Sequence, residues 1–476
     1  MDYEKAFKLA KSHGQEHIFK FWEDITSEEQ KGLLNELKHV DFMLIEKFFE
    51  QTKTSETPRD YSNIEPAPVI HAKDDGEAAH QAEQKGIEAI SKGEVALFLL
   101  AGGLGSRLGF DGPKGYYKAT PVMKKDLFQV FAEKILAKQI QHKVLIDWYI
   151  MTNPDTHEGI IEYFEKNTYF GLNKEHVILF PQRVLPAVDT NGKLLLKSKH
   201  SLFWSPDGTG GFFDALEDHK IISRMQDKKI QTLVCINVDN PLVNLLDEKY
   251  IGYHLLNKAL MSNKVVEKTI PEERVGLLIK NMNNKERIEI LEYTHLTDED
   301  ANKRSEEGNL LYDAGNIANY MFNVSFIEEV QEKRLVHYKP AHKKFNYMDA
   351  TGTIVKPENE NGYKFESFVF DCMPECETAM TYMVLREEEF APIKNAEGVD
   401  SPETSIELQT NLAKRWMRAA GLDKKLIEKI ELAEISPLFA NSQKEFTQKI
   451  KIDKYFYEEI IKEETDIYFG DETGHE

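Results

Sequence analysis

The chain has 476 residues, of which 41% are hydrophobic and 30% charged, a composition typical of a folded protein with two or three domains. The formal net charge of −21 argues against a nucleic-acid-binding surface, which needs basic patches, and no apolar run reaches the roughly 18 to 20 residues of a membrane span. Three sparse cysteines, Cys235, Cys372 and Cys376, and an N-terminus without a signal-peptide pattern indicate a reduced, cytoplasmic protein with no nucleic-acid or membrane partner.

The first 92 residues are predicted to be an N-terminal helical segment followed by a linker. Apolar side chains at helical spacing, among them Trp22, Leu33 and Leu37, predict amphipathic helices up to about residue 50. Residues 52–75 contain Thr-Pro and Pro-Ala-Pro sequences, which predict a linker that lies on the surface.

Between about residue 93 and residue 330, predicted strands alternate with predicted helices, the pattern of a mostly parallel α/β sheet. Strands are expected at 95–101, 147–152, 177–181, 232–238 and 264–269, and helices at 126–141, 155–167, 210–226 and 247–260. Residues 274–294 and 308–324 indicate further β structure over the sheet, and 405–420 a helix. We therefore predict an α/β chain with a central domain at 93–380 and a smaller C-terminal domain at 381–476.

The most informative segment is the loop that follows the first predicted strand. Residues 95–101 form an apolar run, and residues 102–105 then contain three glycines. Glycine lets backbone N–H groups turn toward a ligand and lets that ligand come close, an arrangement that suits phosphates. Two cations, Arg107 and Lys114, follow within the same loop. The segment therefore indicates a site for a nucleotide with several phosphates.

Neither of two common nucleotide motifs describes this loop. The dinucleotide fingerprint G-x-G-x-x-G fails because Leu108 stands where its third glycine is required. The Walker loop fails because Lys114 is followed by Gly115 and not by a serine or threonine. Since the whole chain is negative, a polyphosphate site must be made locally positive by nearby cations and a divalent metal.

The order L-A-G-G-x-G-[ST]-R-L-G…P-K-G is similar to the signature loop of nucleotidyltransferases that make nucleoside-diphosphate sugars. Over most of the chain, the sequence resembles the eukaryotic-type UDP-N-acetylglucosamine pyrophosphorylases. The motifs that carry this resemblance lie at residues 14–17, 21–22, 169–172, 182, 185–187, 206–211, 238–240, 264–269, 314–319, 368–371, 384–386, 392–395 and 434–438. The resemblance implies a catalytic nucleotidyltransferase domain with a mostly parallel, Rossmann-like sheet of the glycosyltransferase-A type, flanked by the N-terminal helical segment and a smaller C-terminal α/β domain.

The resemblance also implies the reaction, which is transfer of UMP from UTP to N-acetylglucosamine 1-phosphate with release of pyrophosphate. The cofactor implied is Mg²⁺, with Mn²⁺ as an alternative, and Asp239 would be its ligand. Arg107, Lys114 and Lys394 would act on the phosphates as catalytic cations. The residues implied to bind the nucleotide are Leu100, Ala101, Gly102, Gly103, Gln182, Gly208 and Lys364. Those implied to bind the sugar are Thr209, which stands where family members often carry Asn, and Gly276, Glu292, Tyr293 and Asn316.

For Asp239, the sequence also supports the role on physical grounds. A carboxylate at the carboxyl end of a parallel strand lies where ligands bind in open α/β sheets. Two alternatives remain open at this point. The acceptor sugar phosphate could be glucose, galactose or N-acetylgalactosamine 1-phosphate, or the chain could be an inactive sugar-nucleotide sensor. The expected partners are the two substrates alone, with no partner protein evident, in a monomer or a homodimer.

Overall fold

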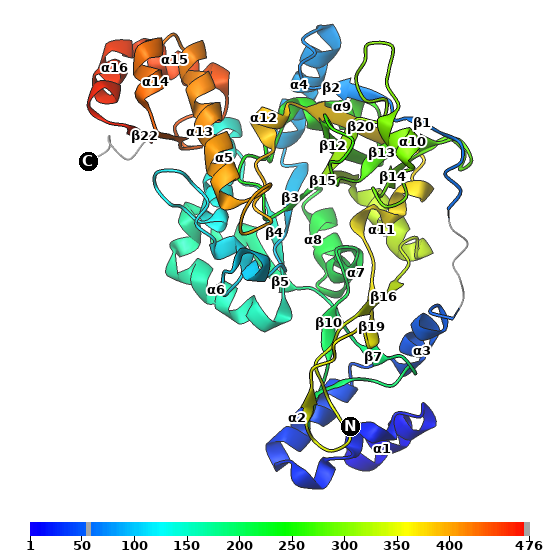
Figure 1. Cartoon of the computed structure of the whole chain (residues 1–476). Helices are drawn as coiled ribbons and strands as arrows, with labels where there is room; N and C mark the ends of the chain where they lie inside the picture. The colour runs from blue at the N-terminus through cyan, green and yellow to red at the C-terminus, as the bar shows by residue number, and fades with distance from the viewer. Residues whose placement is uncertain (54–58, 471–476) are drawn as a thin grey trace. The chain divides into compact units, whose positions relative to one another are not determined.

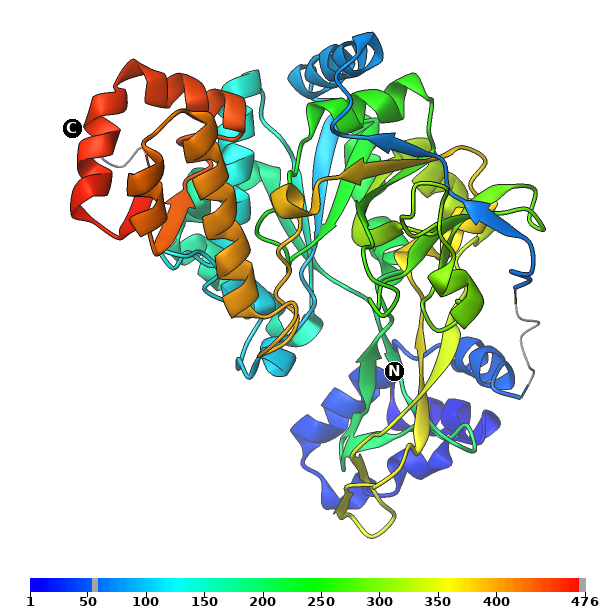
Figure 2. The ribbon, with the colours of Figure 1, turned by 45° about the horizontal axis from the view of Figure 1, so that its top comes forward.

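The computed structural model describes residues 1–53 and 59–470 (Figures 1 and 2). These residues form two compact units. The first consists of Met1–Asp60, Gln182–Asp218 and Val330–Cys372, and the second of Tyr61–Pro181, His219–Glu329 and Met373–Glu476. The sequence-based division at residues 92 and 380 is a different partition, and it stays a prediction.

The second unit is built on a large sheet of mostly parallel strands (Figure 1). Its main path runs β2 (Val69–His71), β20 (Ala379–Val384), β12 (Met261–Glu267), β15 (Ala314–Asn323), β11 (Thr232–Asn237), β3 (Val95–Leu100), β4 (Trp148–Thr152) and β5 (Val177–Pro181). Only β15 runs antiparallel to its neighbours along this path. Each of the five predicted strands is present, with the fifth beginning earlier than expected. The predicted α/β class is confirmed.

Three further strands join this sheet off its main path, namely β1 (Ile64–Pro66), β13 (Leu277–Asn281) and β14 (Arg287–Leu291). They confirm the added β structure predicted near residues 274–294. The prediction of a surface linker at 52–75 is wrong for residues 64–71, because β1 pairs with β13 and β2 with β20. Each of these strands has three residues, too few to show an alternating pattern. Residues 54–58 of the predicted linker lie outside the described residues.

Helices flank this sheet, with α4 (Glu77–Ser91), α5 (Leu127–His142), α6 (His157–Lys166), α8 (Ile221–Asp227), α9 (Glu248–Leu256), α10 (Asp298–Asn302) and α12 (Arg386–Glu389). Two of them, α4 and α9, cross at their glycines. A Cβ atom on Gly86 would lie 1.9 Å from the carbonyl oxygen of Glu248, and one on Gly252 would lie 1.6 Å from that of Ala82. The two backbones can therefore touch only because both positions are glycine.

The single helix predicted at 210–226 is wrong. It is two helices, α7 (Gly211–Asp218) and α8, separated at residues 219–220. Lys220 has a φ of +58°, in the left-handed region that a continuous right-handed helix excludes. The break coincides with the boundary between the two compact units, so α7 belongs to the first unit and α8 to the second.

The core of the second unit lies between the sheet and its helices. All six residues of β3 are buried, as the continuous apolar run predicted. Phe128 on α5 and Trp148 on β4 are among the largest fully buried side chains. The helix α5 begins at Asp126, whose carboxylate accepts the backbone N–H of Gln129 and so caps the helix. The sheet is therefore held rigidly, and the loops at its edges are mounted on a packed core.

The C-terminal part of the second unit has its own small core (Figure 2). It comprises α13 (Pro402–Ala419), α14 (Lys424–Lys429), α15 (Gln443–Ile452), α16 (Lys454–Glu463) and the parallel pair β21 (Leu432–Ile435) and β22 (Asp466–Phe469). The helix predicted at 405–420 is confirmed. Glu434 joins this part to the loop before α5, because its carboxylate accepts the backbone N–H groups of Val122 and Met123 at 2.9 and 2.8 Å.

The first unit contains the predicted N-terminal helices, α1 (Tyr3–Ser12), α2 (Ser27–Leu37) and α3 (Phe42–Glu50). Short strands accompany them: β6 (Val184–Pro186), β7 (Val188–Asp189), β8 (Leu196–Ser198), β9 (Ser201–Leu202), β10 (Trp204–Pro206), β16 (Lys339–Lys343), β17 (Tyr347–Met348), β18 (Ile354–Val355) and β19 (Gly362–Glu366). Leu33, Leu37 and Phe365 share its buried core. The helix α11 (Val324–Lys333) contains residues of both units. Over the residues described, none of the helices combines the length and the apolar character that crossing a bilayer requires.

Candidate functional site

The glycine loop and Asp239 leave the sheet side by side. β3 and β11 are parallel neighbours, so both end at the same edge of the sheet. The pairing continues past the strands, because the backbone N–H of Val238 donates to the carbonyl of Leu100 at 3.2 Å. Ala101, which begins the loop, donates to the carbonyl of Met151 at 2.9 Å. This edge is where open α/β sheets bind ligands.

The loop folds back on itself and returns Lys114 to the glycines. The backbone N–H of Lys114 donates to the carbonyl of Gly103 at 3.1 Å, and that of Gly105 donates to Gly112 at 2.9 Å. Gly109 ends a short helical turn with a φ of +66°, which glycine adopts without strain. Backbone hydrogen bonds thus bring Lys114 next to Gly103, although eleven positions separate them in the sequence.

Lys114 and Asp239 form the centre of this site. The Lys114 Nζ lies 4.0 Å from the Asp239 Oδ2, and the two side chains are 16% and 15% exposed. Burial lowers the pKa of Lys114; the Asp239 carboxylate opposes this, whereas the charges of Lys394 and Arg107 lower it further. The charges of the other two predicted catalytic cations therefore reach Lys114. Their roles stay predictions, but the structure brings them together.

Lys394 is brought close to Asp239 by a backbone hydrogen bond between its neighbour Ile393 and Asp239. The backbone N–H of Ile393 donates to the carbonyl of Asp239 at 2.8 Å. The Lys394 Nζ lies 3.5 Å from the Asp400 Oδ2 and 5.3 Å from the centre of the Phe390 ring. A lysine far along the chain is thus held next to the predicted metal ligand by a backbone hydrogen bond.

Three of the predicted sugar-binding residues also lie together, near the start of β15. The backbone N–H of Asn316 donates to the carbonyl of Gly276 at 2.8 Å. A Cβ atom placed on Gly276 would lie 3.8 Å from the Glu292 Oε1. Tyr293, next to Glu292, is 42% exposed. Because β15 is antiparallel to β11, its first residues lie at the same sheet edge as Asp239.

Asn316 has a local structural role as well. Its side-chain oxygen accepts the backbone N–H of Ala318 at 3.0 Å, and its side-chain nitrogen donates to the Tyr320 hydroxyl at 3.1 Å. Ala318 has a φ of +54°, and the register between β12 and β15 shifts here. The Asn316 amide therefore stabilises an irregularity that re-aims the strand, a common feature next to binding sites.

The remaining predicted residues, Gln182, Gly208, Thr209 and Lys364, belong to the first unit. Gly208 has a φ of +85°, and a Cβ atom there would lie 2.3 Å from the carbonyl oxygen of Ser367. The Thr209 hydroxyl accepts the backbone N–H of Val369 at 3.3 Å. Lys364 is paired with Glu366. In this unit, the glycine-rich loop packs against the residues that follow β19.

Sequence reasoning missed a buried acidic pair beneath that loop. The hydroxyl of Tyr338 lies 3.0 Å from the Asp207 Oδ2 and 2.8 Å from the Asp214 Oδ2. Burial raises the pKa of Asp207 to about 7; the Tyr338 hydrogen bond opposes the change, and the Asp214 charge adds to it. A phenol has one proton to donate, so protonated Asp207 can donate to Tyr338 while Tyr338 donates to Asp214. Arg183 contacts Asp214 at 3.1 Å and helps to balance its charge.

A second set of missed residues lies in the other unit, around Lys264. This lysine is fully buried inside β12, and its Nζ lies 2.9 Å from Asp247 and 2.7 Å from Glu389. Burial alone would lower the pKa of Lys264, but the two carboxylates raise it above its usual range. The local sequence carried little signal, because β12 also contains Ser262, Asn263 and Glu267; only burial in the fold shows that Lys264 needs partners, since a buried lysine is almost always paired.

The donor set suits a metal that binds together with its substrate. Among residues 1–53 and 59–470, no group of three or more His, Cys, Asp or Glu side chains could hold a metal ion. Asp239 is a single, partly accessible carboxylate at the sheet edge. Mg²⁺ is usually bound through one or two carboxylates plus substrate phosphates, so the lone Asp239 fits this mode. Cys372 and Cys376 are both buried.

Comparison with known proteins places the chain in a family. A profile described as UTP–glucose-1-phosphate uridylyltransferase matches residues 41–457. The chain is 36% identical over 428 residues to the human UDP-N-acetylhexosamine pyrophosphorylase-like protein 1, covering 86% of this chain and 84% of that protein. It is 35% identical over 432 residues to UDP-N-acetylglucosamine diphosphorylase 2 of Arabidopsis thaliana, covering 86% and 84%.

Among solved structures, the uridine diphosphate N-acetylglucosamine pyrophosphorylase of Trypanosoma brucei shares the fold. Its TM-score is 0.83, with 24% identity over 99% of this chain and 98% of that one. The resemblance drawn from the motifs is thereby confirmed, and so is the expected fold. The chain belongs to the UTP–glucose-1-phosphate uridylyltransferase family.

Proposed function

We propose that this protein transfers UMP from UTP to N-acetylglucosamine 1-phosphate, giving UDP-N-acetylglucosamine and pyrophosphate. The observation that carries the proposal is the glycine loop at the carboxyl edge of the sheet, where Lys114 lies 4.0 Å from Asp239 and the charges of Arg107 and Lys394 reach Lys114. A relative that matches this chain over 84% of its own length is named UDP-N-acetylglucosamine diphosphorylase 2. A cytoplasmic location and a monomeric or homodimeric state belong to the same proposal.

In the proposed reaction, a phosphate oxygen of the sugar 1-phosphate attacks the α-phosphorus of UTP. A new P–O bond forms, and the bond from the α-phosphorus to the bridging oxygen breaks, so that pyrophosphate leaves in line with the electron pair of that bond. Such a transfer needs little covalent chemistry from the protein. Catalysis comes from positioning the two phosphates and from stabilising the charge that develops on the leaving group.

The three cations supply that stabilisation. Lys114 is held beside the glycines by its own backbone hydrogen bond to Gly103, so its ammonium is in place before substrate arrives. Preorganised charge of this kind acts on the transition state without reorganising. Arg107, on the same loop, and Lys394, next to Asp239, would share the negative charge of the triphosphate and of the departing pyrophosphate.

Asp239 would hold Mg²⁺, with Mn²⁺ as the alternative ion. When bound, the ion would offset the negative charge of the substrate phosphates. Leu100, Ala101, Gly102 and Gly103 would hold the nucleotide, together with Gln182, Gly208 and Lys364. Thr209, Gly276, Glu292, Tyr293 and Asn316 would contact the sugar. These assignments rest on the resemblance and are part of the proposal.

A second candidate is the same transfer to a different sugar 1-phosphate, such as glucose, galactose or N-acetylgalactosamine 1-phosphate. It is favoured by the family description, which names glucose 1-phosphate. A single methyl-sized or hydroxyl-sized difference in a pocket changes specificity by only about 10- to 200-fold. An inactive sensor is a poorer candidate, because Arg107, Lys114, Lys394 and Asp239 are all present.

The test is a panel of sugar 1-phosphates with UTP or ATP, scored by the release of pyrophosphate. We expect the highest kcat/KM with N-acetylglucosamine 1-phosphate and UTP. A preference for glucose 1-phosphate would support the second candidate, and comparable rates with ATP would contradict the uridine assignment. If no pyrophosphate is released with any sugar 1-phosphate, the hypothesis of an inactive sensor replaces that of an enzyme. Calorimetry with UDP-sugars would then identify the ligand of the sensor.

A further inference from the structure

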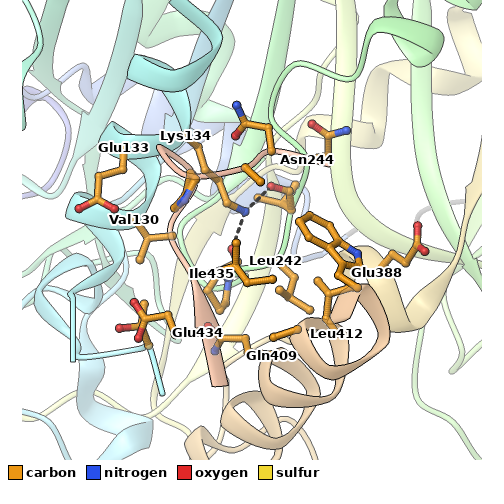
Figure 3. Close-up of a pocket in the computed structure, with 18 of the residues that line it drawn as sticks. Val130, Glu133, Lys134, Leu242, Asn244, Glu388, Gln409, Leu412, Glu434 and Ile435 are labelled. Carbon is orange, nitrogen blue, oxygen red and sulfur yellow. Dashed lines mark hydrogen bonds between the residues drawn. The ribbon is translucent and has the colours of Figure 1, made fainter. Parts of the chain in front are cut away.

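The segment that follows Asp239 is held both by packing and by polar contacts, because Val243, Leu245 and Leu246 are buried in the main core. Residues 240–247 connect β11 to α9 without regular structure. One side of this segment, at Pro241, Leu242 and Val243, borders a cavity of about 270 Å³ (Figure 3). The opposite wall comes from α13 and β21, including Leu412 and Ile435. Where the segment faces this cavity it has fewer packed neighbours than it has toward the core, so its polar contacts matter more on that side.

The first anchor is Asn240, which directly follows the predicted metal ligand. Its side-chain nitrogen donates to the carbonyl of Glu389 at 2.6 Å, and its side-chain oxygen accepts the backbone N–H of Ala391 at 3.0 Å. With the hydrogen bond from Ile393 to Asp239, this ties Asp239 to the chain that leads into Lys394. Three hydrogen bonds thus join residues 239–240, which include the predicted metal ligand, to residues 389–393, which lead into Lys394.

The second anchor is Lys134 on α5, at the wall of the cavity (Figure 3). Its Nζ donates to two carbonyls of the segment, those of Pro241 at 2.6 Å and Val243 at 2.7 Å. Burial lowers the pKa of Lys134 to about 7. A neutral amine has two protons to donate, and these two carbonyls use both. Lys134 therefore connects the rigid helix α5 to the segment across the side that packing leaves open.

The third anchor is the buried charge cluster of Lys264, Asp247 and Glu389. The Lys264 Nζ contacts both carboxylates, at 2.9 and 2.7 Å, and lies 5.3 Å from the centre of the Tyr250 ring. Glu389 in turn accepts the backbone N–H of Asn244 at 3.2 Å. This cluster attaches the far end of the segment to β12, in the middle of the sheet.

We propose that Lys134 is a positioning residue that holds Asp239, and through it the Lys394 segment, in the geometry that binds the metal–nucleotide substrate. Asn240 and Lys264 anchor the same segment from its two ends. Lys134 touches no substrate in this account, since its amino group is used by the two carbonyls. The catalytic consequence rests on the proposed function, in which Asp239 is the metal ligand and Lys394 a cation for phosphate.

The decisive variant is Lys134→Met, which keeps an unbranched side chain one atom shorter than lysine and removes the amino group that donates to both carbonyls. Leaving two carbonyls without a partner is expected to loosen the segment. We expect amide hydrogen exchange in peptides covering 239–247 and 390–395 to speed up by about tenfold or more, while β3 and β4 keep the wild-type rate. We also expect the Mg²⁺ concentration for half-maximal activity to rise about 5- to 20-fold, with a smaller change in KM for the sugar phosphate.

Lys414→Met is the matched control. Lys414 also extends from a helix, α13, to a backbone carbonyl, that of Ile430 at 2.5 Å, and burial also lowers its pKa. It does not contact residues 239–247. Its loss should lower the melting temperature but leave the Mg²⁺ dependence and the exchange of 239–247 unchanged. Lys134→Arg keeps donors next to a cavity with room for the larger side chain, and should restore most of the Mg²⁺ response.

The outcomes separate this inference from the proposed function. If the wild type is active and Lys134→Met keeps its Mg²⁺ dependence and its exchange pattern, positioning by Lys134 is refuted and the proposed function stands. If the wild type releases no pyrophosphate, the proposed function fails, and the exchange experiment alone decides whether Lys134 holds the segment. Should Lys134→Met fail to fold, Lys134→Gln, whose side chain is one atom shorter than that of lysine, is measured in the same way, and Lys134→Arg remains the variant expected to resemble the wild type. Wild-type behaviour of Lys134→Gln would refute the inference, and faster exchange of 239–247 with a raised Mg²⁺ requirement would support it.

Discussion

The chain contains two glycine-rich loops, at residues 101–115 and 205–211, and they serve different physical ends. The first leaves a buried parallel strand, closes on itself, and places Lys114 beside Asp239, with the charge of Arg107 acting on Lys114. Nothing lies within 4 Å of a Cβ atom placed on Gly103. In the second, Gly208 is pressed against the backbone of Ser367, above the buried carboxylates of Asp207 and Asp214. The first loop also has tightly packed glycines, since a Cβ atom on Gly105 would lie 2.7 Å from Phe110. The contrast is therefore between single positions: Gly103 leaves room for a ligand, whereas Gly208 packs against its own chain.

The largest effect should come from the cation of the first loop. Lys114→Ala removes preorganised charge from the leaving pyrophosphate, and loss of one such group typically lowers kcat by about 100- to 1,000-fold. Steady-state kinetics with UTP and N-acetylglucosamine 1-phosphate would measure this. A variant with the wild-type kcat and only a raised KM for UTP would mean that Lys114 binds the nucleotide equally in the ground and transition states.

The next effect should be specific to the sugar. Asn316→Ala leaves polar partners unpaired, at a cost of about 1–3 kcal/mol, so kcat/KM for N-acetylglucosamine 1-phosphate should fall roughly 10- to 100-fold. The loss for glucose 1-phosphate, which lacks the acetamido group, should be much smaller. Because Asn316 also supports the backbone at Ala318, an equal loss on both substrates would assign it to the shape of β15 and not to the acetyl group.

The contrast between Gly208 and Gly103 can be measured as the change in the free energy of unfolding when each is replaced by alanine. Gly208→Ala puts a Cβ atom 2.3 Å from the carbonyl oxygen of Ser367 at a φ of +85°, and should lower the free energy of unfolding by about 1–3 kcal/mol. Gly103→Ala, the matched control, meets no neighbour and should change stability by less than about 0.5 kcal/mol. Urea unfolding of both variants would decide. Equal destabilisation would remove the distinction drawn between the two positions.

The smallest effect concerns pH and the second loop. The folded pKa of Asp207, about 7, lies above its ordinary value of 3.8, so its contribution to stability is full below about pH 4 and is lost as the pH rises to 7. The stability of the wild type relative to Asp207→Asn should therefore fall between pH 5 and 7 and level off above about pH 8. We expect a loss of about 1–2 kcal/mol over this window, since one pKa unit corresponds to about 1.4 kcal/mol. Chemical denaturation at several pH values would measure it, and a difference independent of pH would show that Asp207 is ionised throughout.

Much of the second unit could be predicted because its signals are local. The strand at 95–100 is a continuous apolar run, and α5 has both a capping aspartate and a long apolar pattern. Predictions failed where local signals were short or misleading. The three-residue strands β1 and β2 lie within a proline-rich stretch, and the helix at 210–226 looked continuous because its apolar pattern runs past the left-handed Lys220.

By itself, the sequence determined the family, the α/β class, the glycine loop and the residue types of the proposed site. Only the tertiary structure brought the charges of Arg107 and Lys394 close enough to affect Lys114. It also placed Lys134 and Lys264 in contact with the segment beside Asp239 or its anchors. The reason is physical. Lys134 reaches its two carbonyls across 107 and 109 residues of chain, and Lys264 reaches Glu389 across 125. Charge and hydrogen bonding depend on distances in space, which strand pairing sets and residue order does not.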